Sequence, residues 1–175
     1  SYCATCDGAF FKDQPVAVLG GGDSALSEAL FLTRFARRVT VVHRRDQLRA
    51  QKILQERAFA EPKMDFRWNA VVEAIEGDKV VRQLHLRDVK SGEESTLEVA
   101  GVFVFVGFRP NTEFLGRLLP LDAAGHIVTN EKMETGVPGL WSVGDVRQDS
   151  ARQVVTAAAD GAIAALSVER YLSRL

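Results

Sequence analysis

Pro15-Val16-Ala17-Val18-Leu19-Gly20-Gly21-Gly22-Asp23-Ser24-Ala25 is an apolar run that ends in three glycines, and it predicts a buried parallel strand followed by a tight turn. Apolar residues then recur with helical spacing from Ser24 to about Ala36, which predicts a helix. Val39 to His43 supplies a second strand. A glycine-rich motif indicates nucleotide binding in this order of strand, turn, helix and strand.

Three small residues in this turn match the dinucleotide pattern G-x-G-x-x-G/A. Gly20 permits the turn, Gly22 lets the backbone approach a pyrophosphate, and Ala25 allows close helix packing. The N–H groups near Asp23 and Ser24, at the start of the helix, are expected to point at the phosphates, whose charge the helix dipole favours. Glycines also form turns that bind nothing, but the flanking strands favour a nucleotide site.

The end of the second strand indicates which nucleotide binds. An acidic residue usually stands there when the ligand is NAD, because it accepts hydrogen bonds from the ribose. This chain has His43-Arg44-Arg45, with Arg49 one helical turn further. Guanidinium groups can hold a ribose phosphate by charge-assisted hydrogen bonds. A solvated basic helix start is the alternative, but it puts positive charge where the helix dipole disfavours it. The pattern therefore predicts NADPH.

The chain has two cysteines, Cys3 and Cys6, separated by two residues. Such a pair closes too small a loop to stabilise a fold much, and its chemistry favours disulfide exchange. Half of a zinc site is the alternative. No second cysteine pair exists, however, and His43, His85 and His126 are scattered along the chain. The motif predicts redox chemistry and no metal.

The remaining sequence predicts further elements, and together they give an α/β fold with a Rossmann-like three-layer nucleotide-binding domain and an antiparallel β-meander. The expected elements are a helix over Leu48–Phe59, extended segments over Phe66–Ile75, Val80–Val89 and Ser95–Val99, strands over Val102–Val106 and Gly139–Val143, and a final helix over Val154–Leu172.

Composition narrows the function classes. The chain has 175 residues, of which 46% are hydrophobic and 26% charged, as in an ordinary folded protein. A formal net charge of -1 gives no electrostatic reason to expect nucleic acid or an anionic membrane as a partner. No signal peptide or long apolar run is visible, so we expect a cytoplasmic setting. The start at Ser1, without methionine, suggests a piece of a longer protein.

Together these motifs resemble the low-molecular-weight thioredoxin reductases, the bacterial-type flavoenzymes of the pyridine-nucleotide disulfide oxidoreductase class. The resemblance spans nearly the whole chain. It rests on Cys3-Ala-Thr-Cys6-Asp7-Gly8, the Gly20–Ala25 loop, His43-Arg44-Arg45 with Arg49, Gly107-Phe108-Arg109-Pro110-Asn111, and Thr135-Gly-Val-Pro-Gly-Leu-Trp-Ser-Val-Gly-Asp145.

The resemblance implies roles for the redox motif. Cys6 would face the flavin, Cys3 would exchange with the protein substrate, and Asp7 would donate and accept the accompanying protons. Asp7 could instead be a turn residue before Gly8, as Asp-Gly pairs often are.

The resemblance also implies an FAD contact. The segment from Gly144-Asp145 to Val154, including Arg152 and Gln153, would lie along the flavin, although on its own Gly144-Asp145 indicates only a strand end. Residues 1–104 would form the NADPH-binding domain with the CxxC motif, and residues 105–175 the C-terminal segment of the FAD-binding domain. Family members carry a further FAD-binding half before the CxxC motif. Ser27 departs from the family, since many relatives have glutamate there, while Glu28 stands next to it.

The function expected from this resemblance is thioredoxin-disulfide reduction, with electrons passing from NADPH through FAD and the Cys3–Cys6 pair to oxidised thioredoxin. The parent enzyme would be a homodimer, and residues 1–175 alone would bind NADPH but turn over poorly. Two alternatives are a stand-alone NADPH-binding redox module, and a related flavoprotein that reduces a peroxiredoxin system.

Overall fold

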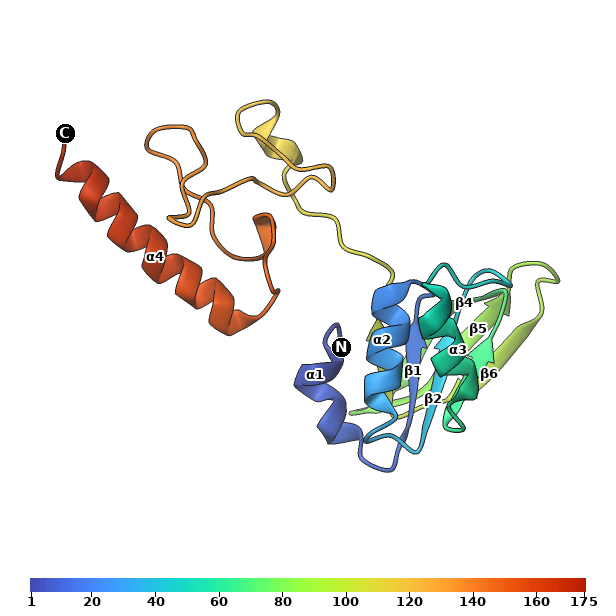
Figure 1. The fold of residues 1–175 in the computed structure, drawn as a ribbon. Coiled ribbons are helices and arrows are strands. Elements are labelled where there is room, and N and C mark those ends of the chain that lie inside the picture. Colours follow the sequence, from blue (N-terminus) through green and yellow to red (C-terminus); the bar gives the residue numbers. More distant parts are fainter. The chain divides into compact units, whose positions relative to one another are not determined.

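The computed structural model describes residues 1–175 and divides them into two compact units, Ser1–Gly107 and Phe108–Leu175. The expected division lay after residue 104. The assignment of the units to an NADPH-binding and an FAD-binding domain stays a prediction. Each unit is described by itself (Figure 1).

The first unit is built on a four-stranded parallel sheet in the order β3-β2-β1-β7. Figure 1 shows two helices, α2 and α3, on one face of this sheet. The bounds are β1 Pro15–Leu19, α2 Asp23–Leu32, β2 Arg38–Val42, α3 Lys52–Ala60, β3 Met64–Arg67 and β7 Gly101–Val104.

Burial on both faces of the parallel sheet explains why β1 is apolar throughout. Val16 and Val18 belong to the cluster that packs under the helices, together with Leu26 of α2. Ala17, between them, belongs to a second cluster on the opposite face. Successive residues of a strand point to opposite faces, so a strand covered on both sides must be apolar at every position.

The second cluster is covered by a three-stranded antiparallel sheet, β4-β5-β6. These strands are β4 Ala70–Gly77, β5 Val81–Asp88 and β6 Glu94–Glu98. Leu84 and Leu86 of β5 are fully or nearly fully buried. The unit therefore has helices, a parallel sheet and an antiparallel sheet in three layers, which confirms the predicted fold class and the meander.

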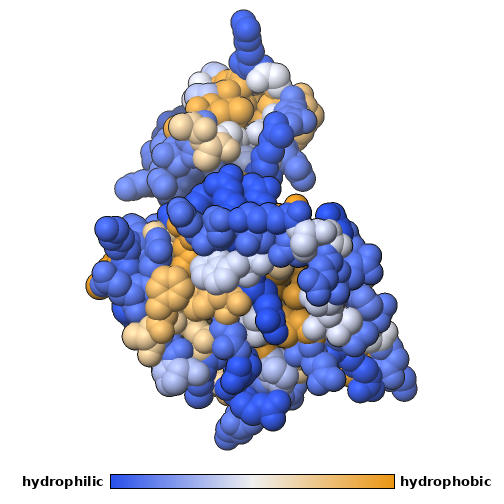
Figure 2. Space-filling view, turned by 90° about the vertical axis from the view of Figure 1, so that its right-hand side faces the viewer, coloured by the Kyte–Doolittle hydropathy of each residue, from blue (hydrophilic) through white to orange (hydrophobic).

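The outer side of the antiparallel sheet is polar. Arg87 pairs with Glu73, and the His85 ring lies 2.9 Å from the Glu76 carboxylate. The view in Figure 2, from the side on which Figure 1 labels β4 to β6, shows mostly hydrophilic residues with smaller apolar patches between them. An antiparallel sheet with one buried and one solvated face is the usual arrangement.

Several element boundaries differ from expectation, among them the start of α3 at Lys52 instead of Leu48. The extended segment expected over Phe66–Ile75 is two strands, because Asn69 adopts a left-handed conformation (φ 52°) that ends β3 and starts β4. Helix α2 ends at Leu32 instead of about Ala36, and a tight turn follows. The strand expected over Val102–Val106 is β7, Gly101–Val104.

The second unit contains one long helix, α4, over Val154–Leu172, as predicted. Two short 3-10 helices precede it, η2 over Glu113–Leu115 and η3 over Gly144–Val146. Trp141 packs edge-on against Tyr171 of α4 with ring centroids 5.3 Å apart, and its indole N–H donates to Ser167 at 3.0 Å. These contacts fix α4 against the irregular segment before it.

The strand expected over Gly139–Val143 is wrong. Trp141 forms a single isolated bridge with Glu134, and η3 follows. A strand is defined by its ladder of hydrogen bonds to a neighbour, and no second strand of this unit lies beside the segment. The apolar composition alone therefore overstated the regular structure.

None of the helices combines the length and hydrophobicity needed to cross a bilayer. No group of three or more His, Cys, Asp or Glu side chains is placed to hold a metal ion.

Candidate nucleotide and disulfide sites

Gly20 makes the turn that leaves β1. Its φ of 139° is unfavourable for any residue with a side chain, and its N–H donates to the Val42 carbonyl at 3.1 Å. A Cβ atom at this position would lie 2.4 Å from the Phe105 carbonyl oxygen. The turn therefore requires glycine at residue 20, and it packs directly between the ends of β2 and β7.

The next two glycines have opposite surroundings. A Cβ atom on Gly21 would lie 2.5 Å from Cε1 of the His43 ring, whereas one on Gly22 would meet nothing within 4 Å. Gly22 caps α2 in an extended conformation, and Ala25 behind it is fully buried. The open side of Gly22 is where a ligand could approach the backbone closely.

The start of α2 offers unpaired amide groups. Backbone N–H groups in the first turn of a helix have no partner within the helix and suit an anion. Ser24 is exposed there. The Asp23 carboxylate is engaged elsewhere, because Oδ1 accepts a hydrogen bond from the Gln51 backbone N–H at 2.7 Å.

A cavity of about 490 Å³ opens where β1, β2 and β7 end. Ligands of open parallel sheets bind at the carboxyl ends of the strands, so this is the place expected for a nucleotide. The cavity is lined by Leu19, Gly20, Gly21, Val42, His43, Arg44, Arg49, Ala70, Val71, Val72, Phe105 and Val106.

His43 shapes this cavity as a neutral group. Its ring is buried, and Nε2 lies 3.1 Å from the Gln47 carbonyl oxygen, which can only accept a hydrogen bond. Burial lowers the pKa of His43 below its ordinary 6.5, and the positive charges of Arg49, Arg45 and Arg44 lower it further, against the raising effect of the hydrogen bond to Gln47. At neutral pH the charge of the site therefore comes from the arginines.

Arg44 and Arg49 also line a neighbouring hollow of about 290 Å³, together with Arg45. None of the three arginines forms an ion pair. Asp46, in the same loop, pairs with Lys90 at 2.6 Å, and this partner lowers the pKa of Asp46. The predicted phosphate-binding arginines thus lie together, and the nearby acid is held by its own cation.

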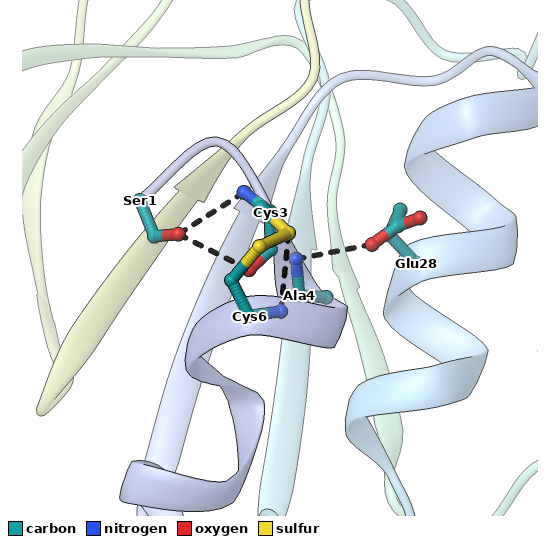
Figure 3. Close-up of a disulfide and its surroundings, with 5 residues drawn as sticks. All are labelled: Ser1, Cys3, Ala4, Cys6 and Glu28. Atoms are coloured by element: carbon teal, nitrogen blue, oxygen red, sulfur yellow. Dashed lines mark hydrogen bonds between the residues drawn. A yellow bond between two sulfur atoms is a disulfide. The ribbon is translucent and has the colours of Figure 1, made fainter. Parts of the chain in front are cut away.

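The two cysteines form a disulfide at the start of α1 (Ala4–Asp7). Figure 3 shows the Ser1 hydroxyl hydrogen-bonded to the backbone of Cys3, and the Cys6 N–H donating to the Cys3 sulfur at 3.1 Å. Cys6 is exposed and Cys3 half-buried. Asp7 is half-buried and follows the disulfide directly. The predicted catalytic residues are therefore gathered in one turn of helix.

Helix α2 joins the disulfide to the nucleotide site. Glu28, on α2, accepts a hydrogen bond from the Ala4 N–H at 3.1 Å (Figure 3). Gly8, just after α1, also packs on this helix, since a Cβ there would lie 3.1 Å from Leu32. The glycine turn and the disulfide are consequently held by the same helix.

The predicted flavin-contact residues belong to the second unit. Gly144 has a φ of 76°, and its N–H donates at 3.0 Å to the Asp160 carboxylate, which is buried and also paired with Arg147 at 2.6 Å. The pKa of Asp160 is lowered, first by the Arg147 hydrogen bond and then by Gly144. Asp145 is exposed and accepts from Ser150 at 3.3 Å. The turn thus holds Asp145 outward.

The end of this segment meets the N-terminus of α4. Arg152 lies over the Phe108 ring at 4.8 Å, Gln153 caps the helix without a side-chain hydrogen bond to it, and Val154 is 90% exposed. An outward carboxylate, open helix amides and an exposed apolar residue are suited to contact one side of a large polar cofactor such as FAD.

Sequence reasoning missed several residues that shape these sites. Gly21 stood in the quoted motif but was given no role. Gln51 belongs to no motif, and Glu28 was named only as the neighbour of Ser27. Their partners, Asp23 and Ala4, lie 28 and 24 residues away. Only the fold brings these pairs together.

Comparison with known proteins shows which family the chain matches. The family described as "Pyridine nucleotide-disulphide oxidoreductase" matches residues 1–161. A thioredoxin reductase of Listeria innocua is 51% identical over 176 residues, covering 100% of the chain and 55% of the relative. One of Bacillus subtilis is 51% identical, with 100% and 56% covered. The chain therefore spans little more than half the length of these relatives.

Solved structures agree. The crystal structure of thioredoxin reductase from Streptococcus pyogenes is 52% identical, covers 100% of this chain and 57% of its own, and superposes with a TM-score of 0.93. Thioredoxin reductase from Giardia duodenalis is 35% identical, with a TM-score of 0.83 over 98% of this chain and 57% of its own.

Proposed function

Because the chain belongs to the pyridine nucleotide-disulphide oxidoreductase family, we propose that it forms the NADPH-binding and disulfide-bearing part of a thioredoxin reductase. The observation that carries this proposal is that one unit holds both the arginine-lined cavity at the glycine turn and the Cys3–Cys6 disulfide. The chain is 51% identical to two relatives named thioredoxin reductase, and this similarity supports thioredoxin as the substrate.

The glycine turn positions the nucleotide. Its pyrophosphate lies against the open side of Gly22 and the amides that begin α2. Its ribose phosphate lies among Arg44, Arg45 and Arg49, which have no carboxylate partners to compete with it. His43 lines the same cavity and, being neutral, adds no charge to it.

The redox step takes place at the disulfide, at the start of α1. Reduction of the Cys3–Cys6 disulfide takes two electrons and two protons and yields two thiols. When bound, FAD would supply the two-electron relay between NADPH and this disulfide. Cys6, the more exposed of the two, would face the flavin, and Cys3 attacks the disulfide of thioredoxin, bonding to one sulfur and releasing the other as a thiol. Asp7, next to Cys6, carries the protons that accompany each sulfur bond broken.

The second unit contributes to the flavin site. Gly144 and Asp145, held by the buried Asp160 pair, and the segment Arg152–Val154 at the start of α4 would contact FAD. We place the complete enzyme in the cytoplasm, as a homodimer that reduces oxidised thioredoxin.

Cofactor choice is the first test. Titration calorimetry on the 175-residue chain should show NADPH binding more tightly than NADH. Replacing Arg44, Arg45 and Arg49 together by glutamine should reduce that preference by roughly ten-fold or more, since hydrogen bonds to charged groups are lost. Arg57→Gln, an exposed site on α3, is the matched control and should leave the preference intact. Equal binding of both nucleotides to the wild type would overturn the proposed site.

A further inference from the structure

A short segment before α3 is tied to the glycine turn by its backbone. The N–H groups of Arg49 and Ala50 both donate to the Gly21 carbonyl, at 2.7 and 3.2 Å. The backbone N–H of Gln51 donates to Asp23 Oδ1 at 2.7 Å, and its side-chain amide donates to Asp23 Oδ2 at 3.3 Å. Four hydrogen bonds therefore join three consecutive residues to two positions of the turn.

These bonds lie where the sequence predicts the start of a helix, at Leu48. A helix starting there would have the Ala50 carbonyl accept from the Leu54 N–H, but that N–H donates to the Gln51 carbonyl at 3.0 Å. Instead α3 begins at Lys52, with Gln51 as its N-cap residue, and the Gln51 side chain makes no capping bond to α3. The Asp23 carboxylate thus fixes the point at which α3 begins.

Asp23 is poorly suited to touch the nucleotide itself. A carboxylate in the first turn of α2 would repel a pyrophosphate at the same helix end, if it were directed there. Both carboxylate oxygens accept hydrogen bonds from Gln51 instead. Charge-assisted hydrogen bonds of this kind hold geometry more firmly than neutral ones.

The segment that Asp23 holds carries Arg49, which lines both hollows of the candidate nucleotide site. We propose that Asp23 and Gln51 are positioning residues that fix Arg49 relative to the glycine turn and so determine how strongly the site prefers a ribose 2′-phosphate. This inference rests on the proposed NADPH site. It assigns selectivity to two residues that do not contact the phosphate.

The test compares two probes in the 175-residue chain by titration calorimetry: adenosine 2′,5′-bisphosphate, which carries the 2′-phosphate, and 5′-AMP, which lacks it. Asp23→Ala should weaken bisphosphate binding by roughly ten-fold and 5′-AMP binding far less, because the lost charged hydrogen bonds release Arg49. Asp23→Asn keeps an oxygen that can accept from the Gln51 N–H, and should retain most of the preference.

Two further variants complete the test. Gln51→Ala removes only the side-chain bond and should reduce the preference less than Asp23→Ala, which also provides a second reading if Asp23→Ala folds poorly. Glu56→Ala removes an exposed carboxylate on α3 and controls for the change in net charge. Circular dichroism checks that each variant is folded.

The outcomes separate the two proposals. A wild-type chain that binds the two probes equally would overturn the NADPH site and this inference with it. A wild type that prefers the bisphosphate, with an Asp23→Ala variant that prefers it just as strongly, would overturn this inference alone. Equal weakening of both probes in Asp23→Ala would also overturn it, since it would show a general effect on the loop.

Discussion

The carboxylate of Glu28 accepts a 3.1 Å hydrogen bond from the backbone N–H of Ala4, which lies between the two cysteines. This contact joins the helix that starts at the glycine turn to the four-residue helix that carries the disulfide. The glycine turn and the disulfide are therefore connected through α2. Because Ala4 is fully buried, few other groups can accept a hydrogen bond from its N–H.

Glu28→Ala should loosen the disulfide turn. The buried Ala4 N–H loses its acceptor, so we expect the unfolding free energy to fall by about 1 kcal/mol and dithiothreitol to reduce Cys3–Cys6 faster. Glu28→Gln keeps an acceptor and should behave like the wild type in both measurements. Ser27→Ala, at the exposed neighbouring position, is the control. An unchanged reduction rate in Glu28→Ala would show that the contact does not hold the turn.

Alanine substitutions at Gly21 and Gly22 should have different effects, the first on stability and the second on NADPH binding. Gly21→Ala forces a methyl group into the His43 ring, so thermal denaturation should show that the free energy of unfolding falls by roughly 2 kcal/mol. Gly22 has an extended backbone and open space, so Gly22→Ala should fold normally but bind NADPH roughly ten-fold more weakly, because the methyl group occupies the pyrophosphate approach. Normal NADPH affinity in Gly22→Ala would place the pyrophosphate elsewhere.

The roles of the two cysteines can be separated by trapping. In Cys6→Ser, the Cys3 thiolate should attack the disulfide of oxidised thioredoxin, bond to one sulfur and release the other as a thiol. With no Cys6 to resolve it, this mixed disulfide should persist and appear by mass spectrometry. Cys3→Ser should form much less. A stable adduct in Cys3→Ser alone would reverse the assignment of the two sulfurs.

The buried neutral His43 predicts a pH dependence of stability. Its pKa in the folded chain is below the ordinary value of 6.5, so the unfolded chain binds the proton more tightly. The stability that the folded chain gains from keeping His43 neutral is complete above about pH 6.5. It is lost as the pH falls from 6.5 towards the pKa of His43 in the folded chain. Melting temperature should therefore drop across this window, and the drop should shrink in His43→Asn. His85→Gln, in which a half-exposed histidine is replaced, should retain it. An identical drop in His43→Asn would contradict the prediction.

Local pattern was sufficient for much of the first unit. The order of β1, α2 and β2 follows from an apolar run, glycines and helical spacing, all of which act between near neighbours. The bounds of α4 also match, because an alanine-rich helix of 19 residues has strong intrinsic propensity. These elements need little information from the rest of the chain.

Contacts between residues far apart in the sequence explain where the structure differs from the sequence prediction. The start of α3 was predicted four residues early, because local pattern does not reveal that residues 49–51 are hydrogen-bonded to Gly21 and Asp23. The segment around Trp141 has strand composition but only one bridge, since pairing depends on a neighbour that composition cannot reveal. In the same way, the motif predicts that the backbone N–H groups near Asp23 meet the phosphates, but it does not reveal the bond of the Asp23 carboxylate to Gln51, 28 residues away.

The most direct test of the proposed electron path is the number of free thiols in the chain after anaerobic incubation with NADPH, measured without flavin and after loading with FAD. Full reduction by dithiothreitol, which should release both Cys3 and Cys6, calibrates the count. The account predicts that the disulfide survives NADPH alone and that two thiols appear only in molecules that retain FAD. Two thiols released by NADPH without flavin would contradict it.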